Sequence, residues 1–113
     1  MFEPSEYIKR QDQGWDLIGK YEEDENPQHL VSALKILGGL DIYVEEGGNI
    51  LLYQQAKTLL GIAYCLANLN DMLDAKVYFD KLENLTPSVF TPQKQELYRL
   101  QQIGRELKIE LQK

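Results

Sequence analysis

The sequence has very few of the residues that form disulfides, metal sites and catalytic dyads. Cys65 is the only cysteine and His29 is the only histidine. A lone cysteine can form neither an internal disulfide nor a thiolate cage around a metal, which fits a reducing compartment. His29 follows Pro27 at a predicted helix start, where a positive charge is disfavoured, so it is a poor general base. We therefore expect no catalysis, no metal and no cofactor.

Long apolar runs are also missing. No stretch approaches the ~20 apolar residues that are needed to cross a bilayer. The first residues lack the basic start and the apolar core of a signal peptide. We expect a cytoplasmic protein with no membrane partner.

An excess of positive charge is missing as well. The 113 residues include 18 acidic and 12 basic side chains, which gives a net charge of −6. Residues 1–48 hold 11 acidic and 4 basic side chains, whereas residues 91–113 hold 3 and 5. Binding to a phosphate backbone requires a basic surface. We therefore expect no nucleic-acid partner.

The sequence does contain enough apolar material for one core. Apolar residues make up 43% of the chain and charged residues 27%, as in ordinary globular domains. A chain of this length buries about two-thirds of its unfolded surface on folding. We expect a single domain over residues 1–113.

Capping residues divide the chain into five predicted helices. Asn26-Pro27 and Thr91-Pro92 each place a capping side chain before a proline that is tolerated in the first helical turn. Asp71 can cap a further helix in the same way. The predicted helices cover residues 4–22, 26–46, 49–68, 71–86 and 91–113, and they indicate an all-α fold.

One stretch is ambiguous between strand and helix. Residues 40–44 alternate apolar and polar side chains, and Gly38 and Gly39 weaken the helix before them by about 1 kcal/mol each. A single strand would have no partner in this chain. We therefore expect a helix, in which the two glycines either produce a kink or allow a neighbour to approach closely.

The predicted third helix is apolar nearly all round, which is typical of a helix that is covered on two sides. We expect it to lie in the middle of the array. Its apolar residues are Leu52, Tyr53, Ala56, Leu59, Leu60, Ile62, Ala63, Tyr64, Cys65, Leu66 and Ala67.

An internal repeat relates the first, third and fifth predicted helices. A shift of about 42 residues superposes Ile18-Gly19 on Leu60-Gly61, and a similar shift brings Gly61 onto Gly104. Small residues at such positions allow helices to cross closely, while large residues fill the space between hairpins. Repeats with this period indicate arrays of helical hairpins.

With this spacing the chain resembles the tetratricopeptide repeat family. The unit that matches best consists of Leu60, Gly61, Tyr64, Ala75, Phe79, Leu82 and Pro87. The resemblance implies two antiparallel hairpins, residues 4–46 and 49–86, stacked as a short right-handed superhelix and closed by residues 92–113. Two departures are turns about two residues longer than in the family, and Lys57 at the position that Trp15 occupies in the first repeat.

In this family the first helix of each hairpin lines a concave groove that receives a peptide or a partner helix. The resemblance therefore implies an adaptor or chaperone-like module that binds another protein. Its acidic wall, its apolar floor near Ile62 and its basic wall would suit an amphipathic helix or an extended segment. Alternatively, Ile62 and Cys65 belong to the core. The implied groove residues are Gln13, Asp16, Lys20, Glu23, Gln55, Thr58, Ile62, Cys65, Tyr98, Gln101, Arg105 and Lys108.

Aromatic residues outside the repeat have their own interpretations. Trp15 and Tyr21 on the first helix are either core residues or an exposed docking patch for a partner or a second copy. The second case would make the protein a structural subunit or a homodimer. Phe90, in the loop between Pro87 and Pro92, is expected to plug the ends of the neighbouring helices.

Overall fold

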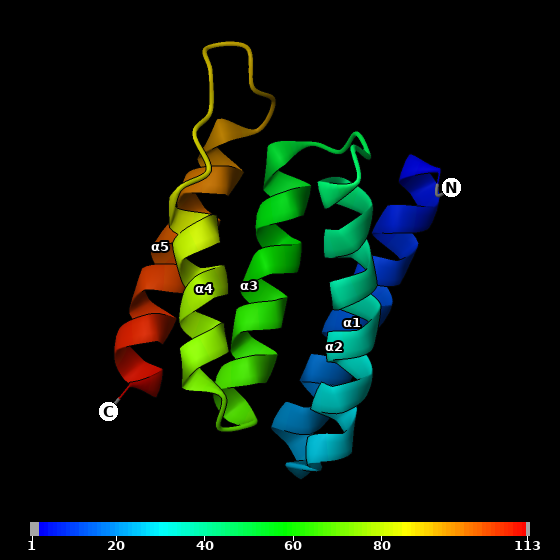
Figure 1. Ribbon diagram of the computed structural model, residues 1–113, viewed down its shortest axis with the longest axis vertical. Coiled ribbons are helices and arrows are strands. Elements are labelled where there is room, and N and C mark those ends of the chain that lie inside the picture. The colour runs from blue at the N-terminus through cyan, green and yellow to red at the C-terminus, as the bar shows by residue number, and fades with distance from the viewer. Residues whose placement is uncertain (1–2, 113) are drawn as a thin grey trace.

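The computed structural model describes residues 3–112, so the predicted domain and helix end at residue 113 lies outside the described part. This part of the chain forms five helices and no strand (Figure 1). The predicted all-α fold of five helices is therefore confirmed. The helices are α1 (Pro4–Asp24), α2 (Pro27–Glu45), α3 (Leu52–Asn68), α4 (Met72–Glu83) and α5 (Lys94–Leu111).

Two of the predicted helix caps are present. The side-chain oxygen of Asn26 accepts a hydrogen bond from the backbone N–H of Gln28 at 3.0 Å. At the start of α4, the carboxylate of Asp71 accepts one from the N–H of Asp74 at 3.1 Å. Each bond satisfies a backbone donor that a helix start would otherwise leave unpaired.

The loop before α5 differs from both predictions made for it. Thr91 caps no helix, because its side-chain oxygen accepts a hydrogen bond from the N–H of Ser88 at 2.8 Å and closes a turn. The helix starts only at Lys94, after Gln93 in a left-handed conformation with φ 57°. Phe90 plugs nothing, since it is 89% exposed on a loop that projects beyond the helix ends (Figure 1). The turn forms its own hydrogen bonds and does not need contact with the core.

Residues 40–44 are helical, as expected, and α2 runs through them without a strand. Of the two roles expected for Gly38 and Gly39, the close approach of a neighbour is contradicted, because a Cβ atom at either glycine would find no heavy atom within 4 Å. Leu37 and Leu40, which flank the glycines, are both 0% exposed. Burial of these leucines stabilises the helix despite the low helix propensity of glycine.

The helices pack as two antiparallel hairpins, α1–α2 and α3–α4, with α5 closing the array against α3 and α4 (Figure 1). Successive helices run in opposite directions, so α1, α3 and α5 point the same way. Only α3 packs against all four other helices. Its predicted place in the middle of the array is confirmed, and its apolar surface on several sides follows from this place.

Two buried clusters share α3. One lies between α3, α4 and α5 and includes Phe79 and Leu97, while the other lies between α1, α2 and α3 and includes Leu37. Two of the three repeat glycines lie at close helix contacts, whereas a Cβ atom at Gly19 would find no heavy atom within 4 Å. A Cβ atom at Gly61 would be 2.6 Å from Cδ1 of Leu37, and one at Gly104 would be 2.6 Å from Cδ2 of Leu82.

Candidate functional site

A hollow of about 360 Å³ lies where α1 and α5 flank α3. The three helices are parallel, and α1 and α5 each pack on α3 without packing on one another. We call this hollow the α1–α3–α5 groove. Its lining consists of Trp15, Ile18 and Glu22 from α1, Lys57, Leu60 and Tyr64 from α3, and Arg99, Leu100, Ile103 and Leu107 from α5.

Helical spacing brings these side chains to one surface. On α1 and on α3 the lining residues are three and then four positions apart, which places them on one face of each helix. The apolar residues that precede the repeat glycines, namely Ile18, Leu60 and Ile103, all belong to the lining. The internal repeat therefore builds the groove from equivalent positions on three parallel helices.

The floor of the groove is apolar and its walls are aromatic and aliphatic. Leu60 and Leu100 are only 3% and 4% exposed, whereas Trp15, Tyr64 and Ile103 are half-buried. The indole Nε1–H of Trp15 donates a hydrogen bond to the backbone carbonyl of Lys57 at 3.2 Å. Because this bond satisfies the polar edge of the indole, the ring serves as an apolar wall.

The two ends of the groove carry opposite charges. Lys57 and Arg99 lie towards the N-terminal ends of their helices, and Arg99 forms an ion pair with Glu96 at 2.7 Å. The hydrogen bond from Arg99, with a smaller contribution from Lys57, lowers the pKa of Glu96. At the other end, Glu22 lies near Tyr64, whose pKa is raised to about 12 mainly by burial and also by this carboxylate. One end of the groove is therefore basic and the other acidic.

None of the residues implied by the family register lines this groove. On each helix, the face that lines the groove differs from the face implied by the family by about one residue. One residue corresponds to roughly 100° about the helix axis. The residues one position earlier than Asp16, Glu23, Thr58, Cys65, Gln101 and Lys108 do line the groove. This is a correction of one position in the assignment.

Several of the implied residues are part of the interior. Thr58 and Ile62 are 1% exposed and Cys65 is 0% exposed. The alternative that Ile62 and Cys65 belong to the core is therefore confirmed. The hydroxyl of Thr58 accepts a hydrogen bond from Nε2 of Gln11 at 2.9 Å. Burial raises the pKa of the Cys65 thiol to about 12, so the reactive thiolate is scarce at neutral pH.

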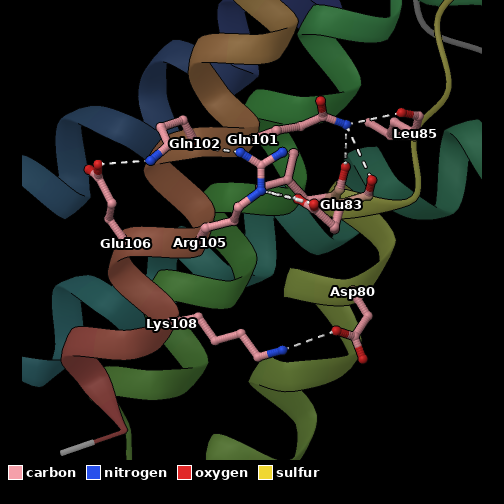
Figure 2. Close-up of polar contacts among 9 residues, drawn as sticks. Asp80, Glu83, Leu85, Gln101, Gln102, Arg105, Glu106 and Lys108 are labelled. Carbon is pink, nitrogen blue, oxygen red and sulfur yellow. Dashed lines mark hydrogen bonds and ion pairs between the residues drawn. The ribbon is translucent and has the colours of Figure 1, made fainter.

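Three of the implied residues of α5, namely Gln101, Arg105 and Lys108, face α4 (Figure 2). Nε2 of Gln101 donates hydrogen bonds to the backbone carbonyls of Leu82 at 3.0 Å and Leu85 at 2.9 Å, so it caps the C-terminal end of α4. Arg105 forms an ion pair with Glu83 at 2.9 Å. These side chains stabilise the contact between two helices, which explains their polar character.

The remaining implied residues are also outside the groove. Lys108 forms an ion pair with Asp80 of α4 at 3.3 Å (Figure 2). Gln55 lines a different hollow, of about 480 Å³, between α2, α3 and α4. The other five are exposed, and contact with a partner there stays a prediction. These five are Gln13, Asp16, Lys20, Glu23 and Tyr98.

Two larger hollows are less suited to a partner. The one beside Gln55 contains charges that are already paired, since Nζ of Lys81 lies 2.9 Å from Glu45 and 3.9 Å from Asp41. Another, of about 640 Å³, is lined only by the end of α2 and the turn that follows, residues 39–49. The α1–α3–α5 groove combines an apolar floor with walls from three helices, and its charged side chains stand at its ends.

Trp15 and Tyr21 are both half-buried, so neither ring forms an exposed patch. Trp15 packs against both core clusters and Tyr21 against the cluster between α1, α2 and α3. The sequence singled out Trp15, but it did not place Tyr64, Lys57 or Arg99 in a site. The apolar residue before each repeat glycine was the available signal for the groove.

The described residues include few side chains that are placed to bind a metal ion together. His29 hydrogen-bonds to Oδ2 of Asp24 at 3.0 Å at the turn between α1 and α2. No group of three or more metal-ligating side chains occurs within residues 3–112. In the same part of the chain, no helix has the length and apolar character to span a bilayer.

Comparison of the chain with protein-family models, curated proteins and solved structures finds no match. The function must therefore be inferred from the fold and from the α1–α3–α5 groove.

Proposed function

We propose that the protein is a tetratricopeptide-like interaction module that binds a segment of another protein in the α1–α3–α5 groove. The observation that supports this proposal most strongly is the groove itself. Three parallel helices supply an apolar floor, and charged side chains stand at both of its ends. Apolar lining with a few placed polar groups is typical of binding sites.

The lining suits recognition by burial of apolar surface. Trp15, Tyr64, Ile103 and Leu107 are only partly covered by the protein itself. An apolar side chain that enters the groove would bury its own surface and theirs, at about 25 cal/mol per Å². Half-exposed aromatic rings in a concave site are common energetic centres of protein interfaces. We propose an adaptor or chaperone-like role in the cytoplasm, without catalysis.

Self-association through α1 is the less favoured alternative. The outward side of α1 is mostly charged or polar, and Ile8, 39% exposed, is its one exposed large apolar residue among those described. Terminal helices of repeat arrays turn such polar surfaces to the solvent. Sedimentation equilibrium at high protein concentration distinguishes the two functions, because a strict monomer contradicts self-association.

The test of the proposed function is photo-crosslinking inside cells that make the protein. A photoreactive phenylalanine analogue replaces Tyr64 in the groove or, as a matched control, Ile109, which is 64% exposed on α5 and outside the groove. We expect a discrete crosslinked product from position 64 that is absent from position 109. Identical products from both positions, or none from position 64, would contradict binding in the groove.

A further inference from the structure

We propose that the occupant of the α1–α3–α5 groove is an amphipathic α-helix that runs antiparallel to α1, α3 and α5. Its basic residue lies near its N-terminus and its acidic residue near its C-terminus. This inference rests on the proposed function and defines the chemistry of the partner segment.

The small number of hydrogen-bonding groups in the groove favours a helix over an extended peptide as the occupant. A buried extended peptide needs partners for its backbone N–H and C=O groups, whereas a helix pairs its own. The described residues form no strand whose edge could pair with it. The groove side chains with polar groups are Glu22, Lys57, Arg99, Tyr64 and Trp15, and the indole N–H of Trp15 is already bonded.

The dimensions of the groove also suit a helix. From Lys57 to Tyr64 the floor extends over seven residues of α3, or about 10 Å at the helical rise of ~1.5 Å per residue. This length corresponds to about two helical turns. The occupant would present apolar residues at positions i, i+3, i+4 and i+7 to Leu60, Ile103 and the ring of Trp15.

Charge determines the direction of this helix. Lys57 and Arg99 outnumber Glu96 at one end of the groove, and Glu22 stands at the other. A helix with an acidic residue beside Lys57 and a basic residue beside Glu22 is complementary to both ends. Reversal of the helix places like charges together at both ends, which is unfavourable.

The helix dipoles favour the same orientation of the bound helix as the charged side chains do. Glu22 lies in the last turn of α1, which ends at Asp24, and the C-terminal end of a helix carries partial negative charge. The N-terminus of an occupant carries partial positive charge, so it is favoured at this end of the groove. Side-chain charge and helix dipole therefore select the same antiparallel orientation.

The probe for the test is a phage-displayed library of helical peptides without tryptophan. The library varies the groove-facing positions and allows either sign of charge at both ends. Selection uses the natural protein and subtracts peptides that also bind the Ile103→Asp variant. Because Trp15 is the only tryptophan and lines the groove, its fluorescence reports occupancy directly.

We expect the selected peptides to carry a basic N-terminal end and an acidic C-terminal end. A synthetic peptide of this kind should bind about three- to tenfold more tightly than its charge-reversed counterpart, as expected for two or three exposed ion pairs. The double variant Glu22→Lys/Arg99→Glu, at exposed positions, should invert this preference. The control Glu46→Lys, at an exposed position after α2 and outside the groove, should leave it unchanged.

Selected peptides that change Trp15 fluorescence but show no charge polarity, or the opposite one, would overturn the inference and leave groove binding intact. Circular dichroism of the bound peptide checks the conformation, and an extended bound peptide would overturn the helix. If no peptide is enriched for the natural protein over Ile103→Asp, with both proteins folded, the proposed function fails together with the inference.

Discussion

Trp15 and Lys57 connect α1 to α3 at the wall of the α1–α3–α5 groove through one hydrogen bond. The indole Nε1–H donates to the backbone carbonyl of Lys57 at 3.2 Å. The two residues occupy matching positions of the internal repeat, so the tryptophan of one repeat is anchored on the backbone of the next. This contact fixes the position of the ring beside the floor of the groove.

Trp15→Phe retains an aromatic ring but removes this hydrogen bond. We expect the free energy of unfolding to fall by about 1–2 kcal/mol, from the lost bond and the smaller ring. Urea denaturation followed by circular dichroism measures the change. Tyr98→Phe is the control, because Tyr98 is 49% exposed and the change should stay within about 0.5 kcal/mol. Equal effects of the two substitutions would contradict an anchoring role.

Gly61→Ala tests the close approach of α2 and α3. Its Cβ atom would lie 2.6 Å from Cδ1 of Leu37. On its other side the Leu37 side chain packs against α1 at Gly14, where an added Cβ would lie 2.8 Å from it. Gly39→Ala is the matched control, since its Cβ meets no heavy atom within 4 Å. Both variants gain helix propensity, so their difference isolates the crowding.

We expect Gly39→Ala to stabilise the protein by about 0.5–1 kcal/mol. Gly61→Ala should be less stable than Gly39→Ala by about 1–3 kcal/mol because of overpacking. Thermal and urea denaturation of the two variants measure this difference. Equal stability of the two variants would show that Leu37 moves aside without cost.

Gln101→Ala removes the cap at the C-terminal end of α4. The amide of Gln101, 5% exposed, donates to the carbonyls of Leu82 and Leu85, and these acceptors would lose a partner (Figure 2). We expect a loss of about 1–3 kcal/mol in the free energy of unfolding. The neighbouring Gln102→Ala, at an exposed position, should change stability by about 0.5 kcal/mol or less. Denaturation curves that coincide for both variants would contradict the capping role.

Phe90→Ala and Phe79→Ala compare an exposed ring with a buried one. Phe90 is 89% exposed on the loop before α5, whereas Phe79 is 4% exposed in the cluster between α3, α4 and α5. We expect Phe90→Ala to change stability by less than about 0.5 kcal/mol and Phe79→Ala to reduce it by about 3–5 kcal/mol. A large loss of stability with Phe90→Ala would mean that the ring packs on the protein in solution.

The buried carboxyl group of Asp41 makes the stability of the protein depend on pH, and the direction of its pKa shift gives the sign. Asp41 is 7% exposed, and burial raises its pKa above the usual 3.8 more than the attraction of Lys81 lowers it. The folded state therefore binds a proton more tightly than the unfolded state. This contribution to stability is present below pH 3.8 and is lost as the pH rises through the raised pKa.

The variant Asp41→Asn has an amide at this position, which does not titrate. Its stability relative to the natural protein should therefore increase as the pH rises from below 3.8 through the raised pKa. Urea denaturation at a series of pH values measures the difference. A difference that is constant with pH would contradict the raised pKa.

Local signals in the sequence predicted the helices well. The caps at Asn26 and Asp71 depend on a side chain and a backbone N–H only two or three residues away, so neighbouring residues decide them. Thr91 failed as a cap because the same hydroxyl has an alternative partner in Ser88. A competition between two local hydrogen bonds cannot be decided from residue type alone.

The position of the groove depended on geometry that no local signal contains. The repeat predicted close contacts correctly at Gly61 and Gly104, but its prediction is wrong at Gly19, where a Cβ atom would meet no heavy atom within 4 Å. Which side of each helix becomes concave depends on how neighbouring helices cross, and an error of one residue rotates the assigned face by roughly 100°. For this reason Thr58 and Gln101 were assigned to the groove, although they lie in the interior.

The place of α3 has a consequence for how the protein can be divided. Both buried clusters use side chains of α3, and α3 packs against every other helix. A fragment that keeps only α1 and α2 loses Ile62 and Cys65 from its buried cluster, and a fragment without α1 and α2 exposes these two side chains of α3. Division of the chain on either side of α3 therefore exposes apolar surface that the intact protein buries, so neither hairpin is an independent unit.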